Sequence, residues 1–327
     1  MTGRLALCAP ARSRLFAERV AAALGMGLTP LEEREFEDGE HKVRPLQSVR
    51  GAHVVVIAAL DGDPSVSADQ KLVRLLFTCA ALRGAGAERL TAVVPYLCYA
   101  RKDRRTKARD PVSTRTVAQL VEAVGVDRIA VLDVHNLQAY QNAFRIPTEH
   151  LEAWPVLVDA VATALGGRRT AVVSPDLGGV PRADRFACAL GRRLGGAPPV
   201  AFMEKRRSEG VVTGHAFVGD VAGRVAVVVD DLVTTGTTLS RAAASSLANG
   251  AETVLAVATH AVFAREANRV LGEAPIERLY VTDSVGAGRL PQGEARDRVE
   301  VVPVTGLLAE AIGRMHGGGS LVELFEP

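Results

Sequence analysis

The stretch Val225–Leu239, VAVVVDDLVTTGTTL, decides the fold and the site that we expect in this chain. It begins with the apolar and mostly β-branched run Val225–Val229, which predicts a buried strand. Two carboxylates follow, Asp230 and Asp231, and then four threonines around Gly236. A strand that leads through a short loop into a helix suits an anion such as a phosphate, because free backbone N–H groups and the positive end of the helix dipole face it.

The polar residues of this stretch divide between two parts of a ligand. Gly236 lets the backbone approach a phosphate, and the threonine hydroxyls can donate to it before a helix expected from Leu239. Asp230 and Asp231 would repel a phosphate, so we expect them to accept hydrogen bonds from vicinal hydroxyls or to hold a cation. Ribose 5-phosphate is the simplest ligand that needs both. A plain polar turn is the alternative, although an unpartnered Asp pair beside a buried strand is costly. The threonines are Thr234, Thr235, Thr237 and Thr238.

The composition indicates a globular, aliphatic-rich protein. Hydrophobic residues make up 48% of the 327 residues and aromatic residues 4%, which disfavours a surface that stacks single-stranded bases. The net charge of +2 gives no overall nucleic-acid footprint. No apolar run approaches the roughly 18 residues of a membrane span, and no signal-peptide pattern is present. We therefore expect a cytoplasmic protein without membrane or nucleic-acid partners. Four cysteines without metal-site spacing predict buried free thiols.

Strand-like segments alternate with helix-like segments along the chain, which favours an α/β fold with mainly parallel sheets flanked by helices. Pro147 and Pro155 bracket a short polar run, so we expect two domains, residues 1–150 and 151–327, with the tail after Gly317–Gly319 packing back on the first. Ligands of such folds bind at the carboxyl ends of strands. The predicted strands span residues 5–8, 53–58, 90–95, 128–132, 170–174, 200–204, 225–229 and 253–260.

Two polar segments of the first half are candidates for a nucleotide site. The run Phe36–Glu40, FEDGE, places an aromatic ring beside carboxylates and a glycine turn, which could clamp a flat ring; a plain acidic loop fits it equally. The run Arg101–Arg109 is densely basic, as a polyphosphate site or an RNA-binding patch would be. No aromatic residue interleaves it after Tyr99, which favours phosphate over stacked bases. A solvated loop is the alternative.

Three further segments carry polar residues beside predicted strands. Asp133 and His135 lie two apart on the expected strand end and so share a face, which suits Mg²⁺ or a histidine oriented by a carboxylate; a core histidine is the alternative. The backbone N–H groups of 177–180 could line a pyrophosphate, with Asp176 holding a bridging cation. The run Glu204–Arg207 places cations where charge develops on a transferring phosphorus.

Taken together, these segments resemble the ribose-phosphate pyrophosphokinase family over nearly the whole chain. The resemblance implies two related domains of the type I phosphoribosyltransferase-like fold, in a homo-oligomer that is a hexamer built from dimers. It also implies transfer of the pyrophosphoryl group of ATP to the anomeric hydroxyl of ribose 5-phosphate, with Mg²⁺, giving phosphoribosyl pyrophosphate and AMP. The motifs are FEDGE at Phe36, VVPYLCYARKDRR at Val93, LDVHN at Leu132, VVSPDLGGVPRA at Val172, MEKRR at Met203, GDVAGRVAVVVDDLVTTGTT at Gly219 and ATHAVF at Ala258.

The resemblance also implies roles for individual residues. His135 and Asp176 would hold Mg²⁺, while Lys205 and Arg207 would stabilise the transferring phosphoryl group. Asp230, with Asp231 beside it, would hold the ribose hydroxyls, and residues 234–238 the 5-phosphate. ATP would meet one group of residues from a neighbouring subunit and a second group from its own subunit. The first group is Phe36, Asp38, Gly39 and Glu40, and the second is Arg101 and Lys102.

Four positions depart from the family pattern. Thr234 replaces an acidic residue of the phosphate loop, and Thr237 replaces its second glycine, where a β-branched residue restricts the backbone. Lys102 stands where glutamine is common, and Val322 where a second serine is frequent in the regulatory tail.

Two other functions remain open at this point. One is a phosphoribosyltransferase that consumes phosphoribosyl pyrophosphate, and the other is a regulatory paralogue without turnover; retention of the predicted metal and catalytic residues disfavours the latter.

Overall fold

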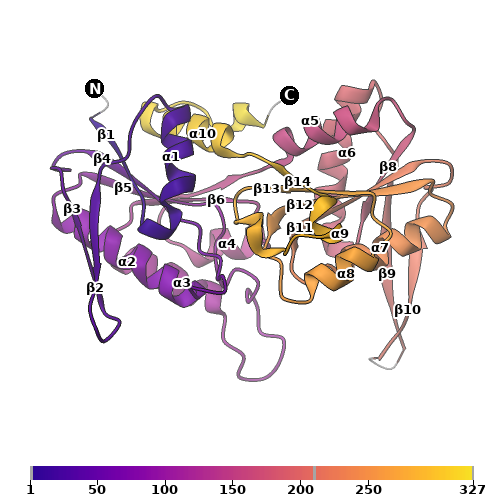
Figure 1. The fold of residues 1–327 in the computed structure, drawn as a ribbon, viewed down its shortest axis with the longest axis horizontal. Coiled ribbons are helices and arrows are strands. Elements are labelled where there is room, and N and C mark those ends of the chain that lie inside the picture. Colours follow the sequence, from indigo (N-terminus) through magenta and orange to yellow (C-terminus); the bar gives the residue numbers. More distant parts are fainter. Residues whose placement is uncertain (1–2, 209–210, 326–327) are drawn as a thin grey trace. The chain divides into compact units, whose positions relative to one another are not determined.

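The computed structural model describes residues 3–208 and 211–325, with side chains for all of these except residues 205–215 and 287. The chain forms two compact units (Figure 1). Unit 1 contains the chain up to Glu152 and again from Thr305 onward, and unit 2 is Ala153–Val304. The predicted division into residues 1–150 and 151–327 therefore differs from the structure at the C-terminal end, because the last helix belongs to unit 1.

Unit 1 is built on a five-stranded parallel sheet with the order β1-β4-β5-β6-β7. Its strands are β1 (Leu5–Cys8), β4 (His53–Ile57), β5 (Arg89–Val94), β6 (Arg128–Leu132) and β7 (Thr148–Leu151). A separate antiparallel hairpin consists of β2 (Leu31–Glu35) and β3 (His41–Pro45). The helices are α1 (Arg14–Ala23), α2 (Ala68–Gly84), α3 (Ser113–Ala123), α4 (Leu137–Ala143) and α10 (Thr305–Gly317). Helix α10 packs beside α1, although nearly 300 residues separate them in the sequence (Figure 1).

Unit 2 is built on a seven-stranded sheet with the order β10-β9-β8-β11-β12-β13-β14, parallel except for the β9–β10 pair. Its strands are β8 (Thr170–Ser174), β9 (Val200–Ser208), β10 (Val211–Val218), β11 (Val225–Val233), β12 (Thr253–Ala261), β13 (Arg278–Thr282) and β14 (Val299–Val302). The helices are α5 (Trp154–Leu165), α6 (Val180–Leu194), α7 (Thr237–Ala248), α8 (Ala267–Glu273) and α9 (Glu294–Asp297). Helices α5 and α6 pack together over one face, and α7 and α8 over the other (Figure 1).

The sequence explains why these sheets lie inside the units. Strand β4, HVVVI, is buried at every position, as expected of a parallel strand covered by helices on both faces. Each unit has its own core, made mostly of Val, Leu, Ala and Ile side chains. Local signals set the helix ends: Ser67 and Gln70 form a capping box at the start of α2, and Gly195 ends α6 with a left-handed φ of 79°. The predicted α/β fold with mainly parallel sheets is confirmed.

Several predictions about local structure were wrong or incomplete. The charged segments LEERE and HKVRP were not predicted as strands, yet they pair with each other as β2 and β3. Three cysteines are buried as predicted, but Cys188 is exposed on α6; all four are free. Within the described parts of the chain, no helix combines the length and the apolar character needed to cross a membrane.

Candidate active site

In the sheet of unit 2, the order in which the chain adds strands reverses beside β8. From β8 the chain passes through α6 to β9 on one side, whereas β11 lies on the other side of β8 and leads outward through α7 to β12. Ligands of open α/β sheets bind beyond the carboxyl ends of the strands at such a reversal. Two predicted segments meet there, because Asp176 follows β8 while Asp230 and Asp231 lie near the end of its direct neighbour β11.

The two aspartates belong to the strand, which corrects the predicted strand end at Val229. Strand β11 continues to Val233, and Asp230 is in register with Ala258 of β12. Asp231 is buried with 4% of its surface exposed, and its backbone N–H donates to Oδ1 of Asp230 over 2.9 Å. The strand therefore holds the pair rigidly, with a carboxylate of one residue bonded to the backbone of the other.

Arg182 is a member of this cluster that was not given a role from the sequence. It lies in the first turn of α6, and its Nη1 atom is 3.8 Å from Oδ1 of Asp230 and 3.9 Å from Oδ1 of Asp231. Burial, reinforced by the neighbouring Asp231 carboxylate, raises the pKa of Asp230 from 3.8 to about 8, although Arg182 opposes the change. The cluster thus carries a carboxyl group that becomes charged readily only when a cation or hydroxyl donors arrive. The sequence signal for Arg182 was its place in the first turn of the helix that follows the Gly-Gly pair.

The loop after β8 is held by its own polar groups. The Ser174 hydroxyl donates to the carbonyl of Asp176 over 2.7 Å, and Oδ1 of Asp176 accepts from the N–H of Gly179 over 2.9 Å. A Cβ atom at Gly179 would lie 2.6 Å from the Ser174 hydroxyl, so only glycine fits this tight turn. The loop therefore brings Asp176 to the sheet edge in a fixed position, at the start of the 3₁₀ turn Leu177–Gly179.

The loop after β11 has the predicted strand–turn–helix form. Gly236 precedes α7 with a φ of 81°, and a Cβ atom there would lie 2.7 Å from Leu271. Helix α7 begins at Thr237, two residues before the predicted start at Leu239. The hydroxyls of Thr235 and Thr237 lie 3.0 Å apart, at the N-terminus of this helix of 12 residues. Thr237 occupies an ordinary helical position, so its β-branched side chain does not restrict the loop in the way the sequence suggested.

The described residues of unit 2 could bind a divalent cation only together with ligands from a substrate. Asp176, Asp230 and Asp231 supply carboxylate oxygens at the ends of neighbouring strands, the ligand type that Mg²⁺ prefers. However, no group of three or more His, Cys, Asp or Glu side chains that could hold a metal ion occurs among the described residues. Mg²⁺ usually binds through one or two carboxylates together with substrate phosphates and water, so the residues fit an ion that arrives with its phosphate ligand.

In unit 1, the predicted FEDGE segment forms the turn of the β2–β3 hairpin. The Phe36 N–H donates to the Glu40 carbonyl over 2.8 Å, and Gly39 has a φ of 87°. Oδ1 of Asp38 accepts from the Glu40 N–H over 3.0 Å. The Phe36 ring is 37% exposed, and the guanidinium of Arg34 lies 5.1 Å from its centre. The turn therefore presents an accessible aromatic ring beside carboxylates.

The basic run Arg101–Arg109 and the segment around His135 are in contact in unit 1. They follow the neighbouring strands β5 and β6, and the side-chain amide of Asn136 donates to Asp103 over 2.5 Å. Nζ of Lys102 lies 2.5 Å from Asp110, and this ion pair, with hydrogen bonds from residues 106 and 107, lowers the pKa of that carboxyl. Arg101 is exposed.

The predicted geometry around His135 was wrong, although the residue does lie at this sheet edge. Strand β6 ends at Leu132, and Asp133 has a left-handed φ of 40°, so Asp133 and His135 do not share a strand face. His135 is exposed and belongs to unit 1, whereas the other predicted metal ligand, Asp176, belongs to unit 2. Lys205 and Arg207 lie in β9, next to β8, but their side chains are outside the described part of the structure.

The fold and the strand-end site define a class of protein. Both units are α/β, and unit 2 combines an Asp pair on one strand with a hydroxyl-lined helix start directly after it, as in the type I phosphoribosyltransferase-like fold.

Comparisons with known proteins identify the family within that class. The N-terminal domain of ribose phosphate pyrophosphokinase matches residues 5–125, and the phosphoribosyl synthetase-associated domain matches residues 209–326. The ribose-phosphate pyrophosphokinase of Caldanaerobacter subterraneus subsp. tengcongensis is 39% identical over 310 residues, covering 94% of each chain. That of Aquifex aeolicus is 37% identical over 314 residues, covering 96% of each.

A solved structure agrees with these sequence relatives. The phosphoribosylpyrophosphate synthetase from Mycobacterium smegmatis is similar with a TM-score of 0.85 and 32% identity, covering 97% of this chain and 100% of that one. The chain therefore belongs to the ribose-phosphate pyrophosphokinase family.

Proposed function

We propose that this chain transfers the pyrophosphoryl group of ATP to the C1 hydroxyl of ribose 5-phosphate. The C1 oxygen forms a bond to the β-phosphorus, the bond from that phosphorus to the α,β-bridging oxygen breaks, and the hydroxyl proton is released. The products are phosphoribosyl pyrophosphate and AMP. One observation supports this proposal above the others: in a member of this family, the Asp pair and the hydroxyl-lined start of α7 occupy the same strand–loop–helix segment.

Ribose 5-phosphate would bind along this segment. Asp230 and Asp231 accept hydrogen bonds from the sugar hydroxyls, and their position on β11 keeps them before the loop. The 5-phosphate binds at the N-terminus of α7, where backbone N–H groups lack partners within the helix and the dipole is positive. The residues of this phosphate site are Thr234, Thr235, Gly236, Thr237 and Thr238.

Mg²⁺ is part of the proposal, with His135 and Asp176 as its protein ligands. When bound, the ion would neutralise phosphate oxygens and so assist phosphoryl transfer. Asp176 is held by Gly179 in a fixed turn, which prepares an oxygen ligand at the sheet edge. His135 is exposed at the end of β6, where its ring is accessible to a metal–nucleotide complex.

ATP would bind through residues of unit 1 and through cations of unit 2. Arg101 and Lys102 approach the phosphates in the same subunit, and the exposed turn with Phe36, Asp38, Gly39 and Glu40 reaches ATP of a neighbouring subunit. Lys205 and Arg207 would stabilise the charge on the transferring group. Phosphoryl transfer depends mainly on alignment and charge neutralisation, so no nucleophilic side chain is needed.

This proposal includes a homo-oligomer, a hexamer built from dimers, because the Phe36 turn would serve a neighbouring subunit. Light scattering of the purified chain tests it, and a monomer that retains full turnover would contradict it.

A cytoplasmic location is also proposed, in keeping with free cysteines in a reducing compartment. A phosphoribosyltransferase that consumes phosphoribosyl pyrophosphate is disfavoured, because the relatives align over nearly the whole chain, unit 1 included.

The decisive experiment follows AMP and phosphoribosyl pyrophosphate together after incubation with ATP, Mg²⁺ and ribose 5-phosphate. We expect the two products in equal amounts. A folded protein that forms neither product, although it binds ribose 5-phosphate, would contradict the proposal.

The Lys205→Ala variant tests the proposed stabilisation of the transferring group. It should lower kcat far more than it changes KM for ribose 5-phosphate, because that residue would act mainly in the transition state. Arg269→Ala is the matched control, since it removes an exposed arginine of α8 that pairs only with Glu273 of the same helix among the described side chains. An unchanged kcat in Lys205→Ala would exclude the assigned role.

A further inference from the structure

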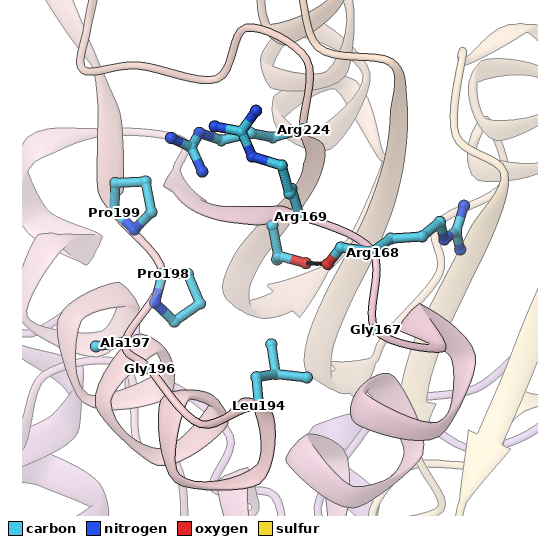
Figure 2. A pocket seen from close by; sticks show the side chains of 10 residues that line it. Gly167, Arg168, Arg169, Leu194, Gly196, Ala197, Pro198, Pro199 and Arg224 are labelled. Carbon is cyan, nitrogen blue, oxygen red and sulfur yellow. Dashed lines mark hydrogen bonds between the residues drawn. The ribbon is translucent and has the colours of Figure 1, made fainter.

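A basic pocket lies in unit 2 at the amino ends of the strands, the sheet edge opposite the candidate active site (Figure 2). Its volume is about 320 Å³. Arg168 and Arg169 directly precede β8, Arg224 directly precedes β11, and Pro198 and Pro199 directly precede β9. We call it the amino-end pocket. Since β8, β9 and β11 are parallel, none of these residues can reach the carboxyl-end loops.

One of the three arginines has a structural role outside the pocket. Nε of Arg168 donates to the Leu165 carbonyl over 3.2 Å, and its Nη2 donates to the Ala164 carbonyl over 3.2 Å. These carbonyls end α5, and a cation there complements the negative end of the helix dipole. Nη1 of Arg168 also lies 3.9 Å from Glu277, and Figure 2 shows the side chain directed away from the pocket.

The other two arginines are not used in this way. Arg169 is exposed, and its guanidinium has no hydrogen-bond or ion-pair partner among the described side chains. Arg224 lies 3.6 Å from Asp220 through Nη2, but its Nε is buried and has no hydrogen-bond partner in the described structure. In Figure 2 both guanidinium groups lie on the same side of the pocket, and the two arginines directly precede Thr170 and Val225, which are paired across β8 and β11. Two cations that line one pocket from neighbouring strands, one of them with a buried donor that lacks a partner, favour an anion there.

Nearby carboxylates do not supply that anion inside the pocket. Asp220 pairs with the Nη2 end of Arg224 over 3.6 Å and is 66% exposed, and Glu277 pairs with Arg168. Glu252 is exposed near Gly223, outside the pocket lining. No acidic residue lines the described pocket.

The opposite wall of the pocket is apolar and rigid. The segment before β9 is fixed by two consecutive prolines and by a hydrogen bond of 2.9 Å from the Val172 N–H to the Pro199 carbonyl. A Cβ atom at Gly191 of α6 would lie 2.5 Å from Cα of Ala197, so helix and wall are in close backbone contact. The pocket is therefore formed before any ligand arrives.

We propose that the amino-end pocket binds a phosphate-class oxyanion through Arg169 and Arg224. The planar guanidinium groups offer paired N–H donors that match the oxygens of a phosphate. The volume of about 320 Å³ lies at the small end of ligand pockets and accommodates inorganic phosphate or a small phosphomonoester whose apolar part rests on the proline wall. This proposal is independent of the proposed reaction.

The test measures binding by isothermal titration calorimetry on the full chain, with inorganic phosphate and, separately, phenyl phosphate. The titrations are run with and without saturating ribose 5-phosphate, which would occupy the loop after β11. We expect Arg169→Ala and Arg224→Gln each to weaken one binding event about tenfold or more. Turnover without added phosphate should be unchanged in both variants. Tighter binding of phenyl phosphate would identify a phosphomonoester as the ligand, and equal or weaker binding would identify free phosphate.

Controls make the result specific to the pocket. Arg193→Ala removes an arginine from the last turn of α6 that is 60% exposed and pairs with Asp159, so it lowers the net charge without touching the pocket. It should bind both anions like the wild type, and Arg169→Lys should bind more tightly than Arg169→Ala. Because the Arg169 guanidinium is exposed and has no polar partner among the described side chains, Arg169→Ala remains informative if Arg224→Gln is unstable. Phosphate binding that is identical in wild type and Arg169→Ala would overturn the proposal, even if the chain proves to have a different enzymatic activity.

Discussion

Replacing Asp230 by asparagine should stabilise the ligand-free protein, and increasingly so as the pH rises. In the folded chain, burial and the Asp231 carboxylate hold the pKa of Asp230 near 8, whereas its ordinary value is 3.8. Between these two values the unfolded chain has lost the proton while the folded chain still binds it. The free energy of unfolding of the wild type therefore falls as the pH rises from about 4 to about 8, and the loss is complete above the higher value.

The structure sets the size of this effect. Two pKa values of 3.8 and about 8 correspond to a free-energy difference of about 6 kcal/mol. The Asp230 side chain is 18% exposed, and water reaching it reduces the penalty, so we expect about 2–4 kcal/mol near pH 8. An asparagine side chain at this position has no charge to desolvate. The midpoint of thermal unfolding should therefore be about 5–10 °C higher in the variant near pH 8, and nearly equal near pH 4.

Calorimetric unfolding of wild type and Asp230→Asn across this pH range, in ligand-free buffer with a chelator, measures the difference. Asp184→Asn is the matched control, because it neutralises an exposed carboxylate on α6. The same Asp230→Asn variant should bind ribose 5-phosphate more weakly, so stability and binding change in opposite directions. A difference in midpoint that stays constant from about pH 4 to about pH 8, or that shrinks with rising pH, would refute the argument.

Two other predictions concern the loop and the N-terminal core. Gly236→Ala should destabilise the protein by about 1–3 kcal/mol and weaken ribose 5-phosphate binding, because the φ of 81° and the 2.7 Å approach to Leu271 both exclude a Cβ atom. Calorimetric unfolding measures the loss of stability. Gly272→Ala is the control, because open space surrounds that position, and it should be nearly neutral in the same assay. Burial, with the charge of a neighbouring arginine, lowers the pKa of His53 from 6.5 to about 4, so the stability of unit 1 should fall as the pH drops between these values. His53→Gln, which can still bond to Thr91, should flatten that pH dependence in chemical unfolding followed by circular dichroism, and an unchanged slope would contradict it.

The sequence was sufficient for the parts of the fold that rest on hydrophobic pattern. Valine-rich runs such as Val225–Val229 are buried on both faces, and this burial makes them recognisable as parallel strands. The hairpin β2–β3 was missed because most of its residues are charged and only partly buried, so few apolar side chains mark its inner face. The end of β11 was misplaced for a related reason: two aspartates look like the start of a loop, although the ladder with β12 continues past them.

The site was predictable in its chemistry and less so in its geometry. The strand–loop–helix form around Gly236 follows from local sequence, and the structure has it. The contact of Arg182 with the Asp pair depends on β8 lying next to β11, which no local pattern specifies. The left-handed φ of 40° at Asp133, which separates it from the face of His135, is likewise set by the surrounding packing.

The return of α10 to unit 1 has a consequence for synthesis of the protein. Unit 2 lies in the chain between Glu152 and Thr305, so its residues leave the ribosome as one continuous stretch. Unit 1 is begun first but lacks the helix that packs on α1 until almost the end of translation. All elements of unit 2 are therefore synthesised before α10, whereas α1 of unit 1 still lacks its partner helix. A released chain that ends just before Thr305 should resist proteolysis better in its second half than in its first.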